Sequence, residues 1–454
     1  MRGTVPPRAT FREVFAVREF RAVWFSQVLS VTGDRLALVA LTLLVFDRTG
    51  SPLLSGLVYA SGYLPWVVGG LFLSELADRY PRRTVMVVCD AVRAVLVAIM
   101  VVPHVPVWAL VALLFVATMF APPFDSARAA ITADILSGER YVLGTAITQT
   151  TFLAGQAIGA VAGGVAVAFL GVRPALAIDA ATFVLSALLV GLGTRARPAA
   201  AQPEQAQSEQ AQSKQAQSKQ AQSKQAQSKQ AQPSPLARMQ AGLRLVFTDR
   251  ALRTLLLFGW LVVFYTIPEG IAAPYTAGLG GGSIATGLVI ASTVVGTTIA
   301  TPLFSRFVGP RRRIDLMGPL AVLTCATLVL TALRPGLAAS LVIFSLSSVF
   351  GTYQLAANTA FVIRVPNERR AQAFGIASMG VIVGQGAAFV AAGAAAEVLT
   401  PAAVIAIGGA LGTVVALVLT LRWRRVSPPG GRHAAGRRPE PAPASRSVPL
   451  RESG

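Results

Sequence analysis

Runs of about twenty apolar residues recur along nearly the whole chain, and short loops that carry arginine separate them. A helix of about 20 residues is long enough to cross the roughly 30 Å hydrocarbon core of a bilayer. The sequence therefore predicts an all-α membrane protein with about 12 transmembrane helices in two six-helix bundles. The runs fall at 22–46, 53–73, 84–102, 107–124, 143–170, 174–193, 252–276, 284–307, 316–333, 337–362, 371–396 and 402–421.

The composition indicates lipid rather than water as the main solvent, because 54% of the residues are hydrophobic and only 13% are charged. Soluble domains carry about 25% charged residues. The net charge of +20 does not indicate nucleic acid. The cationic residues lie in loops and tails, and no segment interleaves them with aromatic residues as a single-strand binding groove does. The expected partners are the lipid bilayer and a small-molecule substrate, with no nucleic acid.

Arginine is concentrated in alternate loops, whereas the intervening loops carry only Arg48, Arg173 and Arg334. Cationic loops are retained on the cytoplasmic side of a membrane. We therefore expect a multi-pass protein of the cell's inner (plasma) membrane, with both termini and the central linker in the cytoplasm.

Five regions are predicted: a cytoplasmic N-terminal segment at 1–21, a bundle at 22–194, a linker at 195–235, a second bundle at 236–425 and a tail at 426–454. The linker repeats the pentapeptide Glu/Lys-Gln-Ala-Gln-Ser. A period of five cannot hold one face of a helix with 3.6 residues per turn, so we expect a disordered tether. The tail, rich in Pro, Gly and Arg, is likewise expected to be disordered.

The loop after the second apolar run carries a recognisable motif. It reads Ser74-Glu-Leu-Ala-Asp78-Arg79-Tyr-Pro-Arg82-Arg83. This resembles the major facilitator superfamily signature, in which Gly-x-Leu-Ala-Asp-Arg leads to a small residue and two basic ones; Ser74 and Pro81 stand where the family usually has Gly.

The resemblance implies a gating loop made of Asp78, Arg79, Arg82 and Arg83. An acid near a helix end can pair with arginine and with the positive N-terminus of a neighbouring helix, and such a contact can break when two bundles rock apart. Asp125, which follows two prolines, is expected to face Asp78 and relay protonation to this gate. In the alternative interpretation the arginines only set the topology.

Glycines spaced at four residues mark the fifth run. Gly155, Gly159, Gly163 and Gly164 look like the exporter signature Gly-x-x-x-Gly-Pro-x-x-Gly-Gly, although Ala160 replaces its proline. Such a stripe lets two helices approach closely, so ordinary membrane helix packing explains much of the pattern as well.

Three further segments add to the resemblance: 175–183, 248–253 and 365–375. Together with the two motifs they are similar to the drug:proton antiporter branch, which includes enterobactin exporters and macrolide efflux pumps. The resemblance implies the major facilitator fold, a monomer, and export of a small hydrophobic molecule such as a drug, macrolide or siderophore. It also implies a proton gradient as the energy source in place of a cofactor.

Ionisable residues inside spanning helices are costly, so each is a candidate functional group. Asp34 lies near the middle of the first run, where an apolar setting favours the protonated acid and lets it take and release a proton. Glu269 lies between Pro268 and Pro274, where the helix is expected to break. These two acids are the predicted proton-coupling residues.

Other intramembrane acids are expected to be structural. Asp90 and Arg93, three residues apart on one helix face, are predicted to form a charge pair. Asp179 and Glu397, near helix ends, are expected to be capped or to reach towards the membrane surface.

An enzyme is not expected, because the sequence contains no phosphate-binding loop, no H-E-x-x-H motif and no G-x-S-x-G elbow. No metal site is expected either, since His104 and His433 are the only histidines and lie in an external loop and in the tail. Proton-coupled uptake of a small metabolite remains open as the alternative. The loop motif around Asp78 and the two-fold helix count argue against a channel and against a membrane receptor that does not transport.

Overall fold

The structure is a computed structural model, and it describes residues 9–73, 76–197, 244, 246–366 and 369–426. Within these residues the chain is helical and contains no strand. Most of the predicted linker and nearly all of the predicted tail lie outside the described residues, as does Ser74 of the gating motif.

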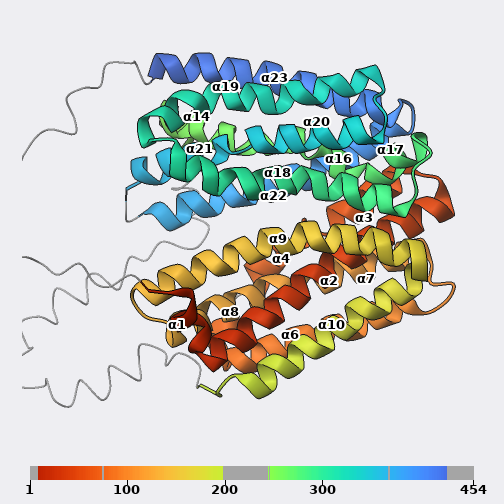
Figure 1. Ribbon diagram of the computed structural model, residues 1–454, viewed down its shortest axis with the longest axis vertical. Helices are drawn as coiled ribbons and strands as arrows, with labels where there is room; N and C mark the ends of the chain where they lie inside the picture. The colour runs from red at the N-terminus through yellow and green to blue at the C-terminus, as the bar shows by residue number, and fades with distance from the viewer. Residues whose placement is uncertain (1–8, 74–75, 198–243, 245, 367–368, 427–454) are drawn as a thin grey trace, which may run out of the picture.

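The described residues of the first bundle form ten helices in chain order, and Figure 1 shows their arrangement. They are α1 (Phe11–Ala16), α2 (Arg18–Thr49), α3 (Pro52–Ser61), α4 (Pro65–Phe72), α5 (Leu76–Arg79), α6 (Arg82–Val101), α7 (Val107–Met119), α8 (Ala121–Ile135), α9 (Glu139–Leu170) and α10 (Val172–Gly193).

The second bundle begins after the linker region. Its elements are α14 (Arg250–Trp260), α15 (Val262–Tyr265), α16 (Ile267–Gly270), α17 (Ala272–Gly278), α18 (Ser283–Phe307), α19 (Pro310–Val329), the 3-10 helix η1 (Leu330–Leu333), α20 (Leu337–Phe350), α21 (Tyr353–Arg364), α22 (Arg370–Ala396) and α23 (Pro401–Val426).

Eleven helical segments among the described residues are long and apolar enough to cross a membrane. The remaining predicted span, the second in chain order at 53–73, is interrupted: α3 ends at Ser61 and α4 begins at Pro65. Proline cannot donate a backbone hydrogen bond within a helix, and Gly62 weakens the preceding turn, so the chain restarts its helix here. The predicted all-α membrane fold is confirmed.

The predicted break around Glu269 is also confirmed. The seventh predicted span, at 252–276, is divided into α14, α15, α16 and α17, and α16 holds only four residues. Pro268 stands at the start of α16, and Ile271 leaves helical geometry between α16 and α17. Short helical pieces separated in this way aim the Glu269 side chain sideways, towards the first bundle.

The two bundles lie side by side in Figure 1. We call the end of the molecule at which α10 finishes and α14 begins the linker side, and the opposite end the far side. The bundles contact each other mainly through two helix pairs, α9 with α18 and α3 with α22.

Glycines on both sides allow these pairs to approach closely near the far side. A Cβ added at Gly164 of α9 would lie 2.5 Å from the Ser283 carbonyl oxygen and 3.2 Å from the Gly287 Cα of α18. A Cβ added at Gly393 of α22 would lie 2.7 Å from the carbonyl oxygen of Pro52 at the start of α3. Small residues of this kind are typical of close helix crossings in membranes.

Candidate functional site

The buried charges of the first bundle gather around one arginine. Arg93 of α6 is 3% exposed and forms an ion pair with Asp34 of α2. Its second nitrogen lies 3.9 Å from Asp90, which is fully buried and accepts a hydrogen bond from Ser186. One guanidinium therefore serves two carboxylates, and its planar fork of donors suits this geometry. Asp90 and Arg93, predicted to pair, lie together, but the closer partner of Arg93 is Asp34.

Asp179 of α10 completes this charge cluster, which comprises Asp34, Asp90, Arg93 and Asp179. Its side chain is 1% exposed, so Asp179 is neither at the membrane surface nor a helix cap, and that expectation is wrong. Gly33 makes the approach possible, because a Cβ at that position would lie 2.2 Å from an Asp179 carboxylate oxygen. The missing side chain at Gly33 thus places a third acid directly beside Asp34.

The Asp34 side chain keeps 41% exposure, unlike the other members of the cluster. It lines a small cavity of about 80 Å³ with Arg35, Arg93, Trp66 and Gln156. An acid that faces a cavity on one side and a buried cation on the other can exchange a proton without unfolding its surroundings.

Glu269 occupies a second polar site, at the contact between the bundles. Its side chain is 5% exposed. It accepts hydrogen bonds from Tyr59 (3.1 Å) and Tyr63 (3.2 Å) of the first bundle, and from Thr293 (3.0 Å) of α18 in the second bundle. Glu269 is therefore held by donors from both bundles, and we call this group of four residues the inter-bundle site.

Aromatic packing shields the inter-bundle site. The rings of Tyr59 and Tyr63 stack with centroids 5.9 Å apart, and Phe389 of α22 packs against both, at 5.0 and 5.2 Å. Phe389 also covers Gly270, where an added Cβ would lie 2.6 Å from its ring. Because hydrogen bonds are electrostatically stronger in such low-dielectric surroundings, each donor to Glu269 matters more than it would in water.

Arg35 joins the two sites through its position next to Asp34 on α2. It donates hydrogen bonds to the Tyr63 hydroxyl (3.2 Å) and to the Gln156 side-chain oxygen. The Tyr63 hydroxyl in turn donates to Glu269. Adjacent residues on a helix point in different directions, so Asp34 and Arg35 enter different networks although they are neighbours in the chain.

Tyr59 and Tyr63 are members of these sites that sequence reasoning missed, and Asp179 is a member whose place it misassigned. The two tyrosines are four residues apart, which places both hydroxyls on one face of an otherwise apolar segment. That spacing is a signal that could have identified them. Asp179 carried the signal of an acid inside a predicted span, but its burial beside Asp34 depends on the packing of α10 against Gly33.

The arginines of the predicted gating loop bind inside the first bundle. Arg82 forms an ion pair with Asp134 of α8, and Arg83 donates to the Gly191 carbonyl oxygen at the end of α10. Arg79 is exposed, and the side chain of Asp78 lies outside the described residues. These contacts tie α6 to its neighbours on the linker side.

Asp125 pairs with Arg128 one helical turn away, at 3.1 Å. The prediction that Asp125 faces Asp78 stays a prediction, because the side chain of Asp78 lies outside the described residues.

The predicted glycine stripe of α9 contacts two different partners. Gly155, Gly159 and Gly163 face α2 in the same bundle, where added Cβ atoms would lie 3.1, 2.5 and 3.0 Å from Val31, Thr32 and Leu36, respectively. Gly164 instead faces α18 in the other bundle. The stripe therefore packs helices together both within and between bundles. Among the described residues no cluster of three or more His, Cys, Asp or Glu side chains could hold a metal ion.

Comparison with known proteins places the chain among transporters. The profile of the Major Facilitator Superfamily matches residues 23–364 and 270–452. The MFS-type transporter YfiS of Bacillus subtilis is 30% identical over 166 residues, which are 36% of this chain and 40% of that protein. Macrolide efflux protein A of Streptococcus pyogenes is 26% identical over 102 residues, which are 22% of this chain and 25% of that protein. The alignments thus span less than half of either relative.

Solved structures share the fold at low sequence identity. A POT family transporter in complex with a thioalcohol-conjugated peptide superposes with a TM-score of 0.68 at 13% identity, covering 93% of this chain and 99% of the other. The nucleoside transporter NupG gives a TM-score of 0.63 at 15% identity, covering 89% and 98%. At such identities the likeness concerns the fold alone.

Proposed function

Because the chain belongs to the Major Facilitator Superfamily, we propose that it is a secondary active transporter that exports a small hydrophobic molecule in exchange for protons by alternating access. The single observation that carries the proton-coupled part is Glu269, a buried acid of the second bundle held by hydroxyls of the first. Its protonation state acts directly on the contact between the bundles.

The proposed coupling uses the charge on Glu269. When ionised, its carboxylate accepts hydrogen bonds from Tyr59 and Tyr63, and Arg35 provides the nearby positive charge. A charge-assisted hydrogen bond is roughly twice as strong as a neutral one, so protonation weakens this link. Opening of the far side removes these donors, so Glu269 takes up a proton while the far side is open and releases it when the link re-forms. Asp34 takes its proton from the small cavity and is the second coupling group.

Export is supported by the glycine stripe of α9 and by the partial similarity to macrolide efflux protein A. The driving force is adequate: a proton that crosses a potential of about 100 mV releases roughly 2.3 kcal/mol. Because 1.4 kcal/mol corresponds to a factor of ten, this supports a concentration gradient of tens-fold. A proton gradient as the energy source and a monomeric transporter are parts of this proposal.

We further propose that the protein lies in the plasma membrane with both termini and the linker side in the cytoplasm. The arginine-rich loops support this orientation. In that orientation the close contacts between α9 and α18, and between α3 and α22, close the external side. Reporter enzymes fused at either terminus should be active only on the cytoplasmic side, and external activity would reverse the orientation.

Transport by the purified protein in proteoliposomes tests the function. Efflux of a panel of hydrophobic drugs and siderophores is measured with an imposed pH gradient and then after a protonophore. Glu269→Gln and Asp34→Asn should lower or abolish the dependence on the gradient. Asp47→Asn, an exposed acid on the same helix as Asp34, is the matched control and should behave as the unmodified protein.

Three outcomes would contradict the proposal. Gradient dependence unchanged in both variants would remove the two acids as coupling groups. Accumulation in the opposite direction would show proton-coupled uptake of a metabolite instead. Absence of transport across the whole panel would favour a receptor, and conduction without saturation would favour a channel.

A further inference from the structure

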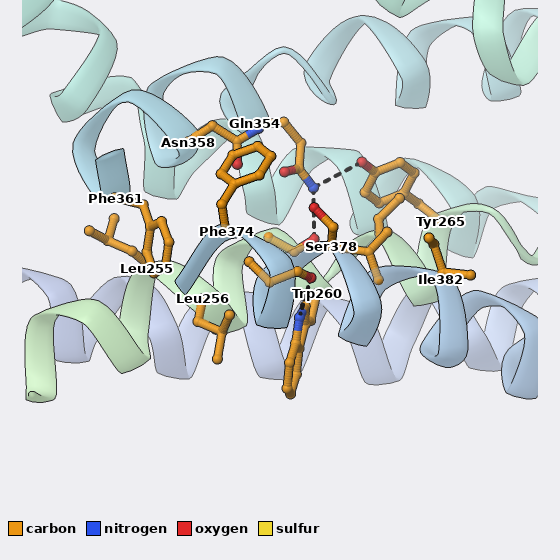
Figure 2. A pocket seen from close by; sticks show the side chains of 14 residues that line it. Leu255, Leu256, Trp260, Tyr265, Gln354, Asn358, Phe361, Phe374, Ser378 and Ile382 are labelled. Atoms are coloured by element: carbon orange, nitrogen blue, oxygen red, sulfur yellow. Dashed lines mark hydrogen bonds between the residues drawn. The ribbon is translucent and has the colours of Figure 1, made fainter. Parts of the chain in front are cut away.

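The second bundle contains a cavity of about 350 Å³ that is separate from both polar sites. Helices α14, α15, α21 and α22 line it (Figure 2). In Figure 1, α14 and α21 lie in the half of the bundle nearer the linker side. Ligand pockets typically measure roughly 300–1,000 Å³, so the cavity is large enough for a modest organic molecule. The residues that line the cavity include Leu255, Trp260, Tyr265, Gln354, Phe361 and Phe374.

The wall of this cavity is uncharged. Among the described residues that line it, aliphatic, aromatic, hydroxyl and amide side chains occur, and none is acidic or basic. A charged ligand would lose its hydration here without gaining an opposite charge, which is unfavourable by several kcal/mol. An uncharged ligand has no such cost.

Gln354 of α21 provides a fixed polar group at the centre of the wall (Figure 2). Its amide nitrogen donates to the Gly259 carbonyl oxygen at 3.0 Å and approaches the hydroxyls of Tyr353 and Tyr265 at 3.2 and 3.3 Å. These contacts fix which end of the amide is the nitrogen. The carbonyl oxygen accepts no hydrogen bond from the described residues, so it is available to a donor on a ligand.

Aromatic rings supply flat contact surface. The Trp260 indole is held by a hydrogen bond to the Ala377 carbonyl oxygen (3.1 Å) and packs where Gly380 lacks a side chain. Phe361 is 5% exposed and Phe374 is 48% exposed, so one ring is fixed in the wall and the other is free at its edge. Aromatic surfaces favour stacked or edge-on contact with a flat partner.

We propose that this cavity binds the transported molecule, and that this molecule is an uncharged aromatic compound with a hydrogen-bond donor directed at the Gln354 carbonyl oxygen. The inference rests on the proposed transport function and names its substrate class. Recognition of the ligand is thereby placed in the second bundle, whereas most of the buried charge lies in the first.

Gly259 allows the cavity to be filled without disturbing its wall. It lines the cavity, and a Cβ added there meets no atom within 4 Å. Gly259→Leu should therefore occupy the cavity while the backbone carbonyl that holds Gln354 remains. Gly278→Leu is the matched control, since that position also has open space and does not line the cavity.

The probe is N-phenyl-1-naphthylamine, a neutral aromatic amine with one N–H donor. Its binding to the purified full-length protein is measured from the shift in thermal unfolding over a concentration series. The cationic dye 10-methylacridinium, of similar ring size, serves as the charged comparison. We expect the neutral probe to stabilise the unmodified protein and Gly278→Leu, and its affinity to fall at least about tenfold in Gly259→Leu, because the site is filled.

A second variant tests the polar contact. Gln354→Met keeps the length of the side chain and removes the acceptor. The affinity for N-phenyl-1-naphthylamine should fall about three- to tenfold, the equivalent of one hydrogen bond. The affinity for its N-methylated analogue, which lacks the donor, should change little, so the comparison separates the hydrogen bond from any loosening of the wall.

The possible outcomes distinguish failure of the proposed substrate site from failure of the proposed transport function. Equal binding to Gly259→Leu and the unmodified protein, tighter binding of 10-methylacridinium than of the neutral probe, or equal losses for both naphthylamines in Gln354→Met would each overturn the assignment. Proton-dependent efflux that persists unchanged in Gly259→Leu would also refute this substrate site while leaving the transport function intact. Binding as expected without any transport would support the site and refute the function.

Discussion

The two bundles are similar in size and helix content, but they differ in where their buried charged side chains lie. In the first bundle, Asp90, Arg93 and Asp179 are buried together beside Asp34. In the second bundle, Glu269 is the one buried charged side chain among the described residues, and it lies at the contact with the first bundle. The cavity between α14, α15, α21 and α22 of the second bundle is instead lined by neutral groups.

Under the proposed function, this difference keeps most of the buried charge away from the proposed ligand cavity. A buried charge needs a partner of opposite sign, so a bundle that handles protons must also hold fixed cations. A bundle that binds a neutral ligand must keep such cations away, because they would favour anionic competitors. The two requirements are easier to meet in separate halves than in one.

Removal of Arg93, the cation of the charge cluster, should give the largest loss of stability. It tests whether the first bundle depends on its buried charges. Arg93→Met leaves Asp34 and Asp90 without their shared partner. Breaking a buried ion pair from one side costs about 3–5 kcal/mol, so we expect a strong loss of thermal stability and yield. Stability is measured by thermal unfolding of the purified protein.

The matched control is Arg128→Met, which removes a cation paired with Asp125 in a more exposed setting. Exposed pairs contribute about 0–1 kcal/mol, so little change is expected. Combining Arg93→Met with Asp34→Asn and Asp90→Asn should restore part of the loss. An equal loss of thermal stability in Arg93→Met and Arg128→Met would show that the charge cluster contributes no more to stability than the pair of Arg128 with Asp125.

Separation of the bundles at the far side is the next largest effect. Gly164→Val places a side chain where the Ser283 carbonyl oxygen and the Gly287 Cα would lie 2.5 and 3.2 Å from its Cβ. Overpacking of this kind costs about 1–3 kcal/mol, so the far side should open in a larger fraction of molecules. Spin labels at Phe169→Cys and Leu333→Cys, in a chain without its two native cysteines, report the distance between the bundles.

Gly163→Val serves as the control in this experiment, because Gly163 packs against Leu36 within the first bundle. It should lower stability and leave the distribution of distances between the bundles unchanged. An identical distance change in both variants would mean that the contact of α9 with α18 does not set the closed state.

Loss of one phenol at the inter-bundle site should have a moderate effect. Tyr59→Phe removes one hydrogen bond to Glu269 and leaves the ring in place. Such a bond contributes about 1 kcal/mol, so the balance between closed and open far sides should shift about fivefold towards open. Tyr275→Phe, which loses a hydrogen bond to Ser340 inside the second bundle, should not shift it.

The smallest effect is expected at Glu397, on the far-side surface. Its carboxylate accepts from the Ser51 hydroxyl and from the Leu53 backbone N–H (3.0 Å) at the start of α3. These donors lower the pKa of Glu397 below its usual value. A lowered pKa means that the contact is present above the usual value, about 4.3, and is lost as the pH falls through the lowered one.

We therefore expect acid to loosen the far-side contact slightly in a Glu269→Gln chain, in which the coupling acid cannot titrate, and the further substitution Glu397→Gln to remove this remaining pH dependence. The same spin-label pair measures both. A far side that closes more tightly at low pH would contradict the sign of this prediction.

Much of the fold could be predicted from the sequence, because the bilayer sets the length of a spanning helix. The apolar runs located every spanning segment, and Pro268 with Pro274 located the broken helix. The interruption between Ser61 and Pro65 was not anticipated. Its residues are as apolar as a continuous span, so hydropathy alone could not reveal it.

The site was predicted only in part. Asp34 and Glu269 stood out because ionisable residues are rare at these positions. Their partners did not, since the pairing of Arg93 with Asp34, and of Tyr59 with Glu269, joins helices that are distant in the chain. The burial of Asp179 depends on the bare backbone at Gly33, which no linear pattern records.

The adjacency of Asp34 and Arg35 on α2 has a mechanical consequence. Asp34 enters the core of the first bundle, and Arg35 points towards the second bundle. Both side chains belong to a single turn of α2. Any twist of α2 about its own axis moves the two together. Under the proposed mechanism, a proton that arrives at Asp34 therefore alters the contact of Arg35 with Tyr63, and through Tyr63 the hydrogen bond to Glu269 of the opposite bundle, by rotation of one helix.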